Sequence, residues 1–134
     1  MPEDQAWDEP GVTTKLSPRP VADTATRLTG LAEARGMKVF DVIDQREQAR
    51  EAGLDLRETI LVIFGSPAAG TPVMDGAPLA ALDLPLKVLV WDDAGQTRVS
   101  YYGPATLAAR HDLPGDLAAR LAGIDALTDA LVAP

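Results

Sequence analysis

The sequence has no cysteine, few aromatic residues and few basic residues, and each shortage limits the structures or functions that the chain can have. Without cysteine there can be no disulfide bond, thiolate nucleophile, cysteine-ligated zinc or iron–sulfur cluster. With two residues each of Trp, Tyr and Phe, the core must consist mainly of Leu, Val, Ile and Ala. The formal net charge of −8 argues against a nucleic-acid or anionic-membrane surface, because both need clustered Lys and Arg.

Long hydrophobic runs are also missing from the chain. No apolar stretch approaches the roughly 18 residues of a transmembrane helix, so we expect no membrane span. The first residues, MPEDQAWDEPG, are acidic and lack the basic-then-apolar pattern of a signal peptide. We therefore expect a soluble, cytoplasmic protein that binds neither membrane nor nucleic acid. We also expect residues 1–11 to form a disordered acidic tail.

The rest of the chain, residues 12–134, is long enough for a single domain with its own core. Runs rich in β-branched residues predict strands, and apolar residues at spacings of three and four predict helices. The predicted strands cover 12–16, 37–44, 59–64, 86–93 and 97–102, and the main helices cover 18–35 and 113–132. Because the strands come in an unbroken run, the predicted class is α+β in the order β-α-β-β-β-β-α. Its five-stranded sheet should be mostly antiparallel, with both main helices on one face.

The central strands are apolar on both faces, which two helices on one face cannot cover. Soluble monomers rarely expose a contiguous apolar patch of more than a few hundred Å². We therefore predict a two-fold homodimer that buries the second face of the sheet. The residues expected in this interface are Leu61, Ile63, Leu89 and Trp91.

The segment FGSPAAGTPVM, residues 64–74, combines glycines and prolines with no charge. It is not a Walker A motif, because no Lys follows its second glycine. Glycine lets the backbone come close to other groups, so we predict a tight loop beside a pocket. Phe64 and Met74 should face inward, and the backbone amides near Gly70 and Thr71 should be partly free.

The titratable residues allow structural as well as functional interpretations. The single histidine, His111, cannot build a multi-histidine metal site, and we expect it in an exposed loop. Asp44 and Glu47 have the spacing of a capping box, although a carboxylate at a strand end can also serve a site. Asp83 and Lys87 lie in an apolar stretch, which predicts a partly buried ion pair.

Several motifs in a fixed order resemble the family catalogued as domain of unknown function 302. Members of that family have a strand ending in FGNP or a near variant, then Gly-Thr and Met, an LDLPLK segment, and a strand ending in Tyr. The corresponding residues here are Phe64 to Pro67, Gly70-Thr71, Met74, Leu82 to Lys87, and Tyr101 or Tyr102. The resemblance covers roughly residues 12–133.

The resemblance implies a β-α-β(4)-α fold like that of the TATA-binding-protein group, without implying DNA binding. It brings no biochemical activity, since the family is named for lacking one. Many members carry His where this chain has Gln45 and Asn where it has Ser66. Any family chemistry that needs those side chains should be altered here.

The function favoured by these observations is a small-molecule binding module with its pocket beside residues 64–74. One alternative is a structural or interaction domain without a ligand. A less favoured alternative is an enzyme that uses Asp44 or Asp83 as a general base. We expect no cofactor and no metal. The predicted ligand-binding residues are Phe64, Gly65, Ser66, Thr71, Met74, Asp83, Lys87, Trp91 and Tyr101.

Overall fold

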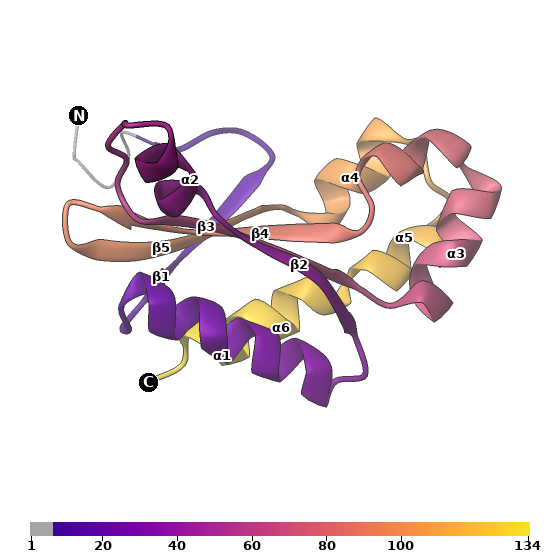
Figure 1. Ribbon diagram of the computed structural model, residues 1–134. Helices are drawn as coiled ribbons and strands as arrows, with labels where there is room; N and C mark the ends of the chain where they lie inside the picture. Colours follow the sequence, from indigo (N-terminus) through magenta and orange to yellow (C-terminus); the bar gives the residue numbers. More distant parts are fainter. Residues whose placement is uncertain (1–6) are drawn as a thin grey trace.

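The computed structural model describes residues 7–134 as one antiparallel sheet with helices on one face and at one end (Figure 1). The sheet has five strands in the order β1-β5-β4-β3-β2, and every neighbouring pair is antiparallel. The strands are β1 (Val12–Ser17), β2 (Lys38–Asp44), β3 (Thr59–Gly65), β4 (Leu86–Asp93) and β5 (Gln96–Tyr102). The predicted α+β class and the strand count are therefore confirmed.

A two-residue turn joins β4 to β5. Ala94 and Gly95 both have positive φ angles, of 50° and 94°, which match the twist of an antiparallel hairpin. The carboxylate of Asp92 accepts a hydrogen bond from the Gly95 amide at 3.2 Å and holds the turn. The sequence Asp93-Ala94-Gly95 thus produces a tight hairpin between the two predicted strands.

Two helices, α1 (Val21–Ala34) and α6 (Gly123–Val132), pack on the same face of the sheet, below it in Figure 1. Their apolar stripes meet alternate residues of the central strands, because side chains of a strand alternate between its faces. The fully buried side chains of this main core include Leu28, Phe64, Val88, Ile124 and Leu131. The apolar stripes of both predicted helices are therefore buried within one copy of the chain.

The predicted helix over 113–132 is interrupted. It consists of α5 (Gly115–Ala118), the 3-10 turn η3 (Ala119–Leu121) and α6. Leu117 and Leu121, from the first part, enter a second hydrophobic cluster with Val73 and Leu107. That cluster also involves α3 (Pro67–Gly76), η2 (Pro78–Leu82) and α4 (Pro104–Arg110), which gather at one end of the sheet (Figure 1).

The prediction of a tight loop over 64–74 is wrong, because most of this segment is helix α3. Ser66 is its N-cap: the hydroxyl accepts a hydrogen bond from the Ala69 amide at 3.2 Å. Pro67 follows at the first helical position, where the missing amide costs nothing. Ser-Pro is therefore a helix start here.

The face of the sheet opposite α1 and α6 is called the open face, and it includes Leu16, Leu61, Ile63, Leu89 and Tyr102. Helix α2 (Gln45–Glu51) packs against β3, above the sheet in Figure 1. Leu16 and Tyr102 are 53% and 46% exposed, so this face is only partly covered. Within residues 7–134, no helix is long and apolar enough to cross a membrane.

The N-terminal segment also reaches the open face. The ring of Trp7 stands perpendicular to that of Trp91 with centroids 5.9 Å apart, and its Nε1 donates to Asp93 at 3.2 Å. The Arg57 guanidinium lies over both rings, at 5.4 and 5.9 Å. Trp7 thus contacts the sheet, and residues 1–6 of the predicted tail lie outside the described range.

Candidate functional site

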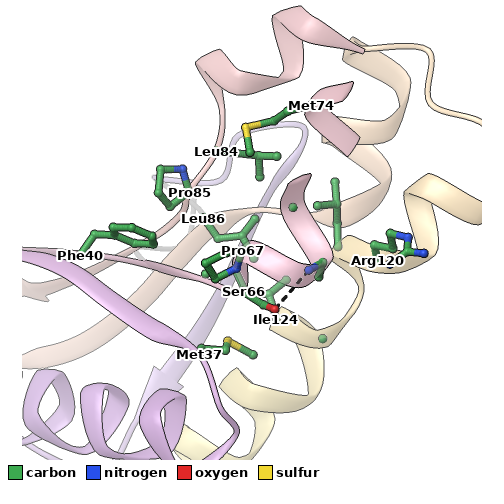
Figure 2. A pocket seen from close by; sticks show the side chains of 15 residues that line it. Met37, Phe40, Ser66, Pro67, Met74, Leu84, Pro85, Leu86, Arg120 and Ile124 are labelled. Carbon is green, nitrogen blue, oxygen red and sulfur yellow. Dashed lines mark hydrogen bonds between the residues drawn. The ribbon is translucent and has the colours of Figure 1, made fainter. Parts of the chain in front are cut away.

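A cavity of about 330 Å³ lies beside α3, and we call it the α3 cavity. Figure 2 shows its lining side chains, which come from the start of β2, from α3, from the segment before β4, and from the η3–α6 junction. The lining residues are Met37, Phe40, Gly65, Ser66, Pro67, Ala69, Gly70, Met74, Leu84, Pro85, Leu86, Arg120, Leu121, Gly123 and Ile124. Its volume lies within the usual range for ligand pockets, about 300–1,000 Å³.

The cavity forms where the two hydrophobic clusters meet. Met37 and Ile124 belong to the main core, Leu84 and Leu121 belong to the second cluster, and Leu86 contacts both. Because each cluster packs around its own elements, the space between them stays unfilled. The position of the cavity therefore follows from the division of the apolar residues between two cores.

Local backbone irregularities bring particular residues to the cavity wall. The β2–β3 pairing shifts register between Val39 and Asp41, and Phe40 lies at this bulge. A bulge adds one residue to a strand and redirects its side chain. On the opposite wall, the Leu84–Pro85 peptide bond is cis and leads directly into β4.

The lining is apolar with a few polar groups. Met37 and Met74 contribute thioethers, which adapt to irregular ligand shapes. Ser66 provides a hydroxyl whose oxygen already accepts from Ala69, so that its proton can be donated. Among the lining residues that the structure describes, Arg120 is the only charged one and none is a carboxylate.

The structure brings three of the predicted ligand-binding residues to the α3 cavity, namely Gly65, Ser66 and Met74. Phe64 is fully buried in the main core, and Thr71 is on the exposed side of α3. Trp91 lies on the open face, where its Nε1 donates to Ser100 at 3.0 Å, while Tyr101 points to the helical face. The predicted single pocket containing both aromatic rings is therefore wrong, because neighbouring strands place them on opposite faces.

Sequence reasoning missed the lining residues that come from outside 64–74. Met37, Phe40, Arg120 and Ile124 are far from α3 in sequence. Only the LDLPLK segment carried a usable signal, since Leu84, Pro85 and Leu86 directly follow Asp83 and all line the cavity. The other residues reach the site through tertiary packing.

The predicted ion pair between Asp83 and Lys87 is wrong. Asp83 pairs instead with Arg110, at 3.0 Å, and with His111 Nε2, at 2.6 Å. Asp83 ends η2 and faces α4, whereas Lys87 lies in β4 with an exposed side chain. His111, expected in an exposed loop, has a side chain that is only 10% exposed.

This ion-paired cluster shifts the titration of Asp83. Burial by itself would raise the pKa of the Asp83 carboxyl, but hydrogen bonds and positive charge from His111 and Arg110 outweigh it. The net result is a pKa below the ordinary value of 3.8. None of the three residues lines the α3 cavity, so they act as a clamp between η2 and α4.

Tyr101 belongs to a second polar network, between β5 and α6. Its hydroxyl donates to Asp125 at 2.6 Å and accepts from Thr128 at 3.1 Å. The Lys15 ammonium reaches Thr128 at 2.6 Å and Asp129 at 2.8 Å. Burial, together with the hydrogen bond to Asp125, raises the pKa of Tyr101 above 10.0.

The remaining candidate, Asp44, caps α2. Its carboxylate accepts a hydrogen bond from the Glu47 amide at 3.0 Å, which confirms the predicted N-cap. Asp44 does not line the α3 cavity. No group of three or more His, Cys, Asp or Glu side chains with metal-binding geometry occurs within residues 7–134.

Comparison with known proteins identifies the family. The model for "Domain of unknown function DUF302" matches residues 12–131. The chain belongs to the DUF302 family. The crystal structure of an uncharacterized conserved DUF302 protein from Bacillus stearothermophilus has the same fold, with a TM-score of 0.78. That alignment covers 92% of this chain and 97% of the other, at 21% sequence identity.

Curated relatives of this DUF302 chain are longer proteins. The "Fluoride-specific ion channel FluC 1" of Brucella suis biovar 1 is 41% identical over 104 residues, which span 77% of this chain and 41% of that protein. The protein of the same name from Brucella abortus biovar 1 has the same identity, with 38% of its length matched. The chain thus spans about two fifths of the length of the curated relatives it matches.

Proposed function

We propose that this DUF302 chain binds a small, mainly apolar molecule in the α3 cavity. The observation that carries the proposal is a cavity of about 330 Å³ with an apolar lining and a few polar groups at its wall. Interior space in proteins is normally packed at crystal-like density, so a cavity of this size is a departure that a ligand would explain.

The lining supports binding more than catalysis. Among the described lining residues, Ser66 carries the only hydroxyl, and none is a histidine or a carboxylate that could act as its base. Asp44 and Asp83, the proposed general bases of the enzyme alternative, have partners outside the cavity. The geometry therefore favours a binding module over a carboxylate-dependent enzyme.

The test is to fill the cavity from within. A Cβ at Gly70 would lie 3.9 Å from Met74 and 4.0 Å from Leu84, so a larger side chain projects into the cavity without a backbone clash. We expect Gly70→Leu to abolish binding of the neutral apolar dye Nile red, measured by fluorescence. Native mass spectrometry of the wild-type chain should reveal a co-purified ligand that the variant lacks.

Gly30→Leu is the matched control. Gly30 is also a helical glycine, in α1, and a Cβ there meets nothing within 4 Å. This variant should bind Nile red like the wild type. Equal dye binding by Gly70→Leu and Gly30→Leu would contradict a ligand in the α3 cavity.

A second candidate function is interaction with a membrane channel. It is favoured by the curated relatives, which are named fluoride-specific ion channels and match this chain over only part of their length. The partly exposed open face offers apolar side chains, including Leu16 and Tyr102, for such a contact. Co-purification of this chain with a fluoride channel, lost in Leu16→Glu, would support this candidate, and its absence would count against it.

A further inference from the structure

One charged side chain, that of Arg120, is among the described lining residues of the α3 cavity. Arg120 borders the cavity, and within residues 7–134 it forms no ion pair. Four other arginines of the same range do pair with carboxylates. Arg19, Arg27, Arg35 and Arg57 also lack an ion pair in this range, so what distinguishes Arg120 is its place in the cavity wall.

The backbone adds to this positive character. Helices α3 and α6 both begin at the cavity wall, where Ser66, Pro67, Gly123 and Ile124 are lining residues. The N-terminal end of α3, a helix of ten residues, carries a partial positive charge, whereas α6 directly continues the turn η3. The Ser66 hydroxyl supplies another donor. All polar features of the lining side chains and helix ends therefore suit a hydrogen-bond acceptor or an anion.

We infer that the ligand is an amphipathic organic anion, with an apolar body in the cavity and one negatively charged group at Arg120. This inference rests on the proposed binding function. A carboxylate, sulfonate or phosphate group would serve, since a guanidinium pairs with each of them in bidentate geometry.

Three probes with the same alkyl chain separate the charge from the apolar body. Decanoate, decanol and decyltrimethylammonium are titrated, below their micelle concentrations, against Nile red bound to the full chain. Decanoate should displace the dye at the lowest concentration, decanol at a higher one, and the cation at the highest. We expect about a tenfold difference between decanoate and decanol, the effect of roughly one charge-assisted contact.

Variants of Arg120 test whether this side chain causes the preference for decanoate over decanol. Arg120→Gln should weaken decanoate binding about tenfold and leave decanol unchanged, because only the charged contact is lost. Arg120→Lys should keep the preference for the anion, and Arg120→Glu should reverse it in favour of the cation. Arg35→Gln is the control, since Arg35 also lacks an ion pair within residues 7–134 but does not line the cavity.

The outcomes distinguish the two proposals. If decanol and decanoate displace the dye equally and Arg120→Gln changes neither, the anion inference is wrong while the cavity still binds apolar molecules. If neither Nile red nor any of the three probes binds the wild-type chain, the proposed binding function itself fails. A preference for decanoate that survives in Arg120→Glu would also overturn the assignment to Arg120.

Discussion

At the scale of single residues, the most informative finding is the change of partner at Asp83. The apolar neighbours of Asp83 correctly indicated that its carboxylate needs a partner. The predicted partner was Lys87, because it lies four residues further along the chain. In the structure, Arg110 and His111 occupy that role from another helix. We expect Asp83→Asn to lower the free energy of unfolding by about 1 kcal/mol. Lys87→Met, at an exposed position, should change it by less than about 0.5 kcal/mol.

The effect of Asp83→Asn should depend on pH. The pKa of Asp83 is lower in the folded chain than its ordinary value of 3.8, so its stabilisation is complete above pH 3.8. It is lost as the pH falls through the lower folded value. Urea unfolding of both proteins, at neutral pH and in steps below pH 3.8, should show their stabilities converging. A constant difference at all these pH values would contradict the ion-pair explanation.

Tyr101 gives the opposite pH dependence. Its hydroxyl is buried between Asp125 and Thr128, so Tyr101→Phe should cost about 1–2 kcal/mol at neutral pH. Burial raises the pKa of Tyr101 in the folded chain, so the stabilisation is complete below pH 10.0 and decreases as the pH rises through the folded value. Urea unfolding above pH 10.0 should therefore show a steeper loss in the wild type than in Tyr101→Phe. Parallel losses would indicate that Lys15, whose pKa is also raised, accounts for the alkaline behaviour.

At the scale of secondary-structure elements, helix α3 depends on its N-cap. Ser66→Ala removes the hydroxyl that accepts from the Ala69 amide, and we expect a loss of about 1 kcal/mol in the free energy of unfolding. Ser66→Asn should stay within a few tenths of a kcal/mol, since Asn caps helices about as well as Ser. Thermal or urea unfolding of the two variants compares them directly. Equal destabilisation by Ala and Asn would contradict the capping role.

This capping role explains one difference between the chain and many members of the DUF302 family. Where those members have Asn, Ser66 makes the same kind of contact to the helix amide, so the replacement keeps the helix start. Gln45, at the other position, is the first residue of α2, which has no buried residue. Gln45 therefore supplies no fully buried contact to the fold.

At the scale of the whole molecule, the predicted homodimer stays a prediction, with a modified interface. Trp91 is covered within the chain by Trp7 and Arg57, so it is removed from the expected contact. Leu61, Ile63 and Leu89 remain partly exposed on the open face, beside the more exposed Leu16. Light scattering should then give a mass of twice 14.1 kDa.

A matched pair of variants tests this interface. Leu16→Glu places a charge on the open face and should shift the chain to the 14.1 kDa monomer. Leu79→Glu, at an exposed position of η2 away from that face, should leave the dimer intact. A wild-type mass of 14.1 kDa would refute the dimer.

The sequence by itself determined the strands, the hairpin at Ala94-Gly95, the two helical stripes and the cap at Asp44. These features depend on side-chain periodicity and turn geometry, which involve residues close in sequence. They can therefore be predicted from the sequence alone. The tertiary structure decided the rest. Apolar periodicity predicts that a position is buried, but not which hydrophobic cluster it joins. The structure shows that the apolar residues of 113–132 belong to two different clusters.

The α3 cavity and the ion pairs share this origin. Arg120 and Phe40 meet around the cavity, and Asp83 meets His111, because packing brings together segments that local rules treat independently. Alternation along a strand predicted which face of the sheet each residue occupies. It did not predict which helix end or loop packs against that residue. The candidate site was therefore only partly predictable: Ser66 and Met74 came from a local motif, and the charged residue that defines the proposed ligand came from the fold.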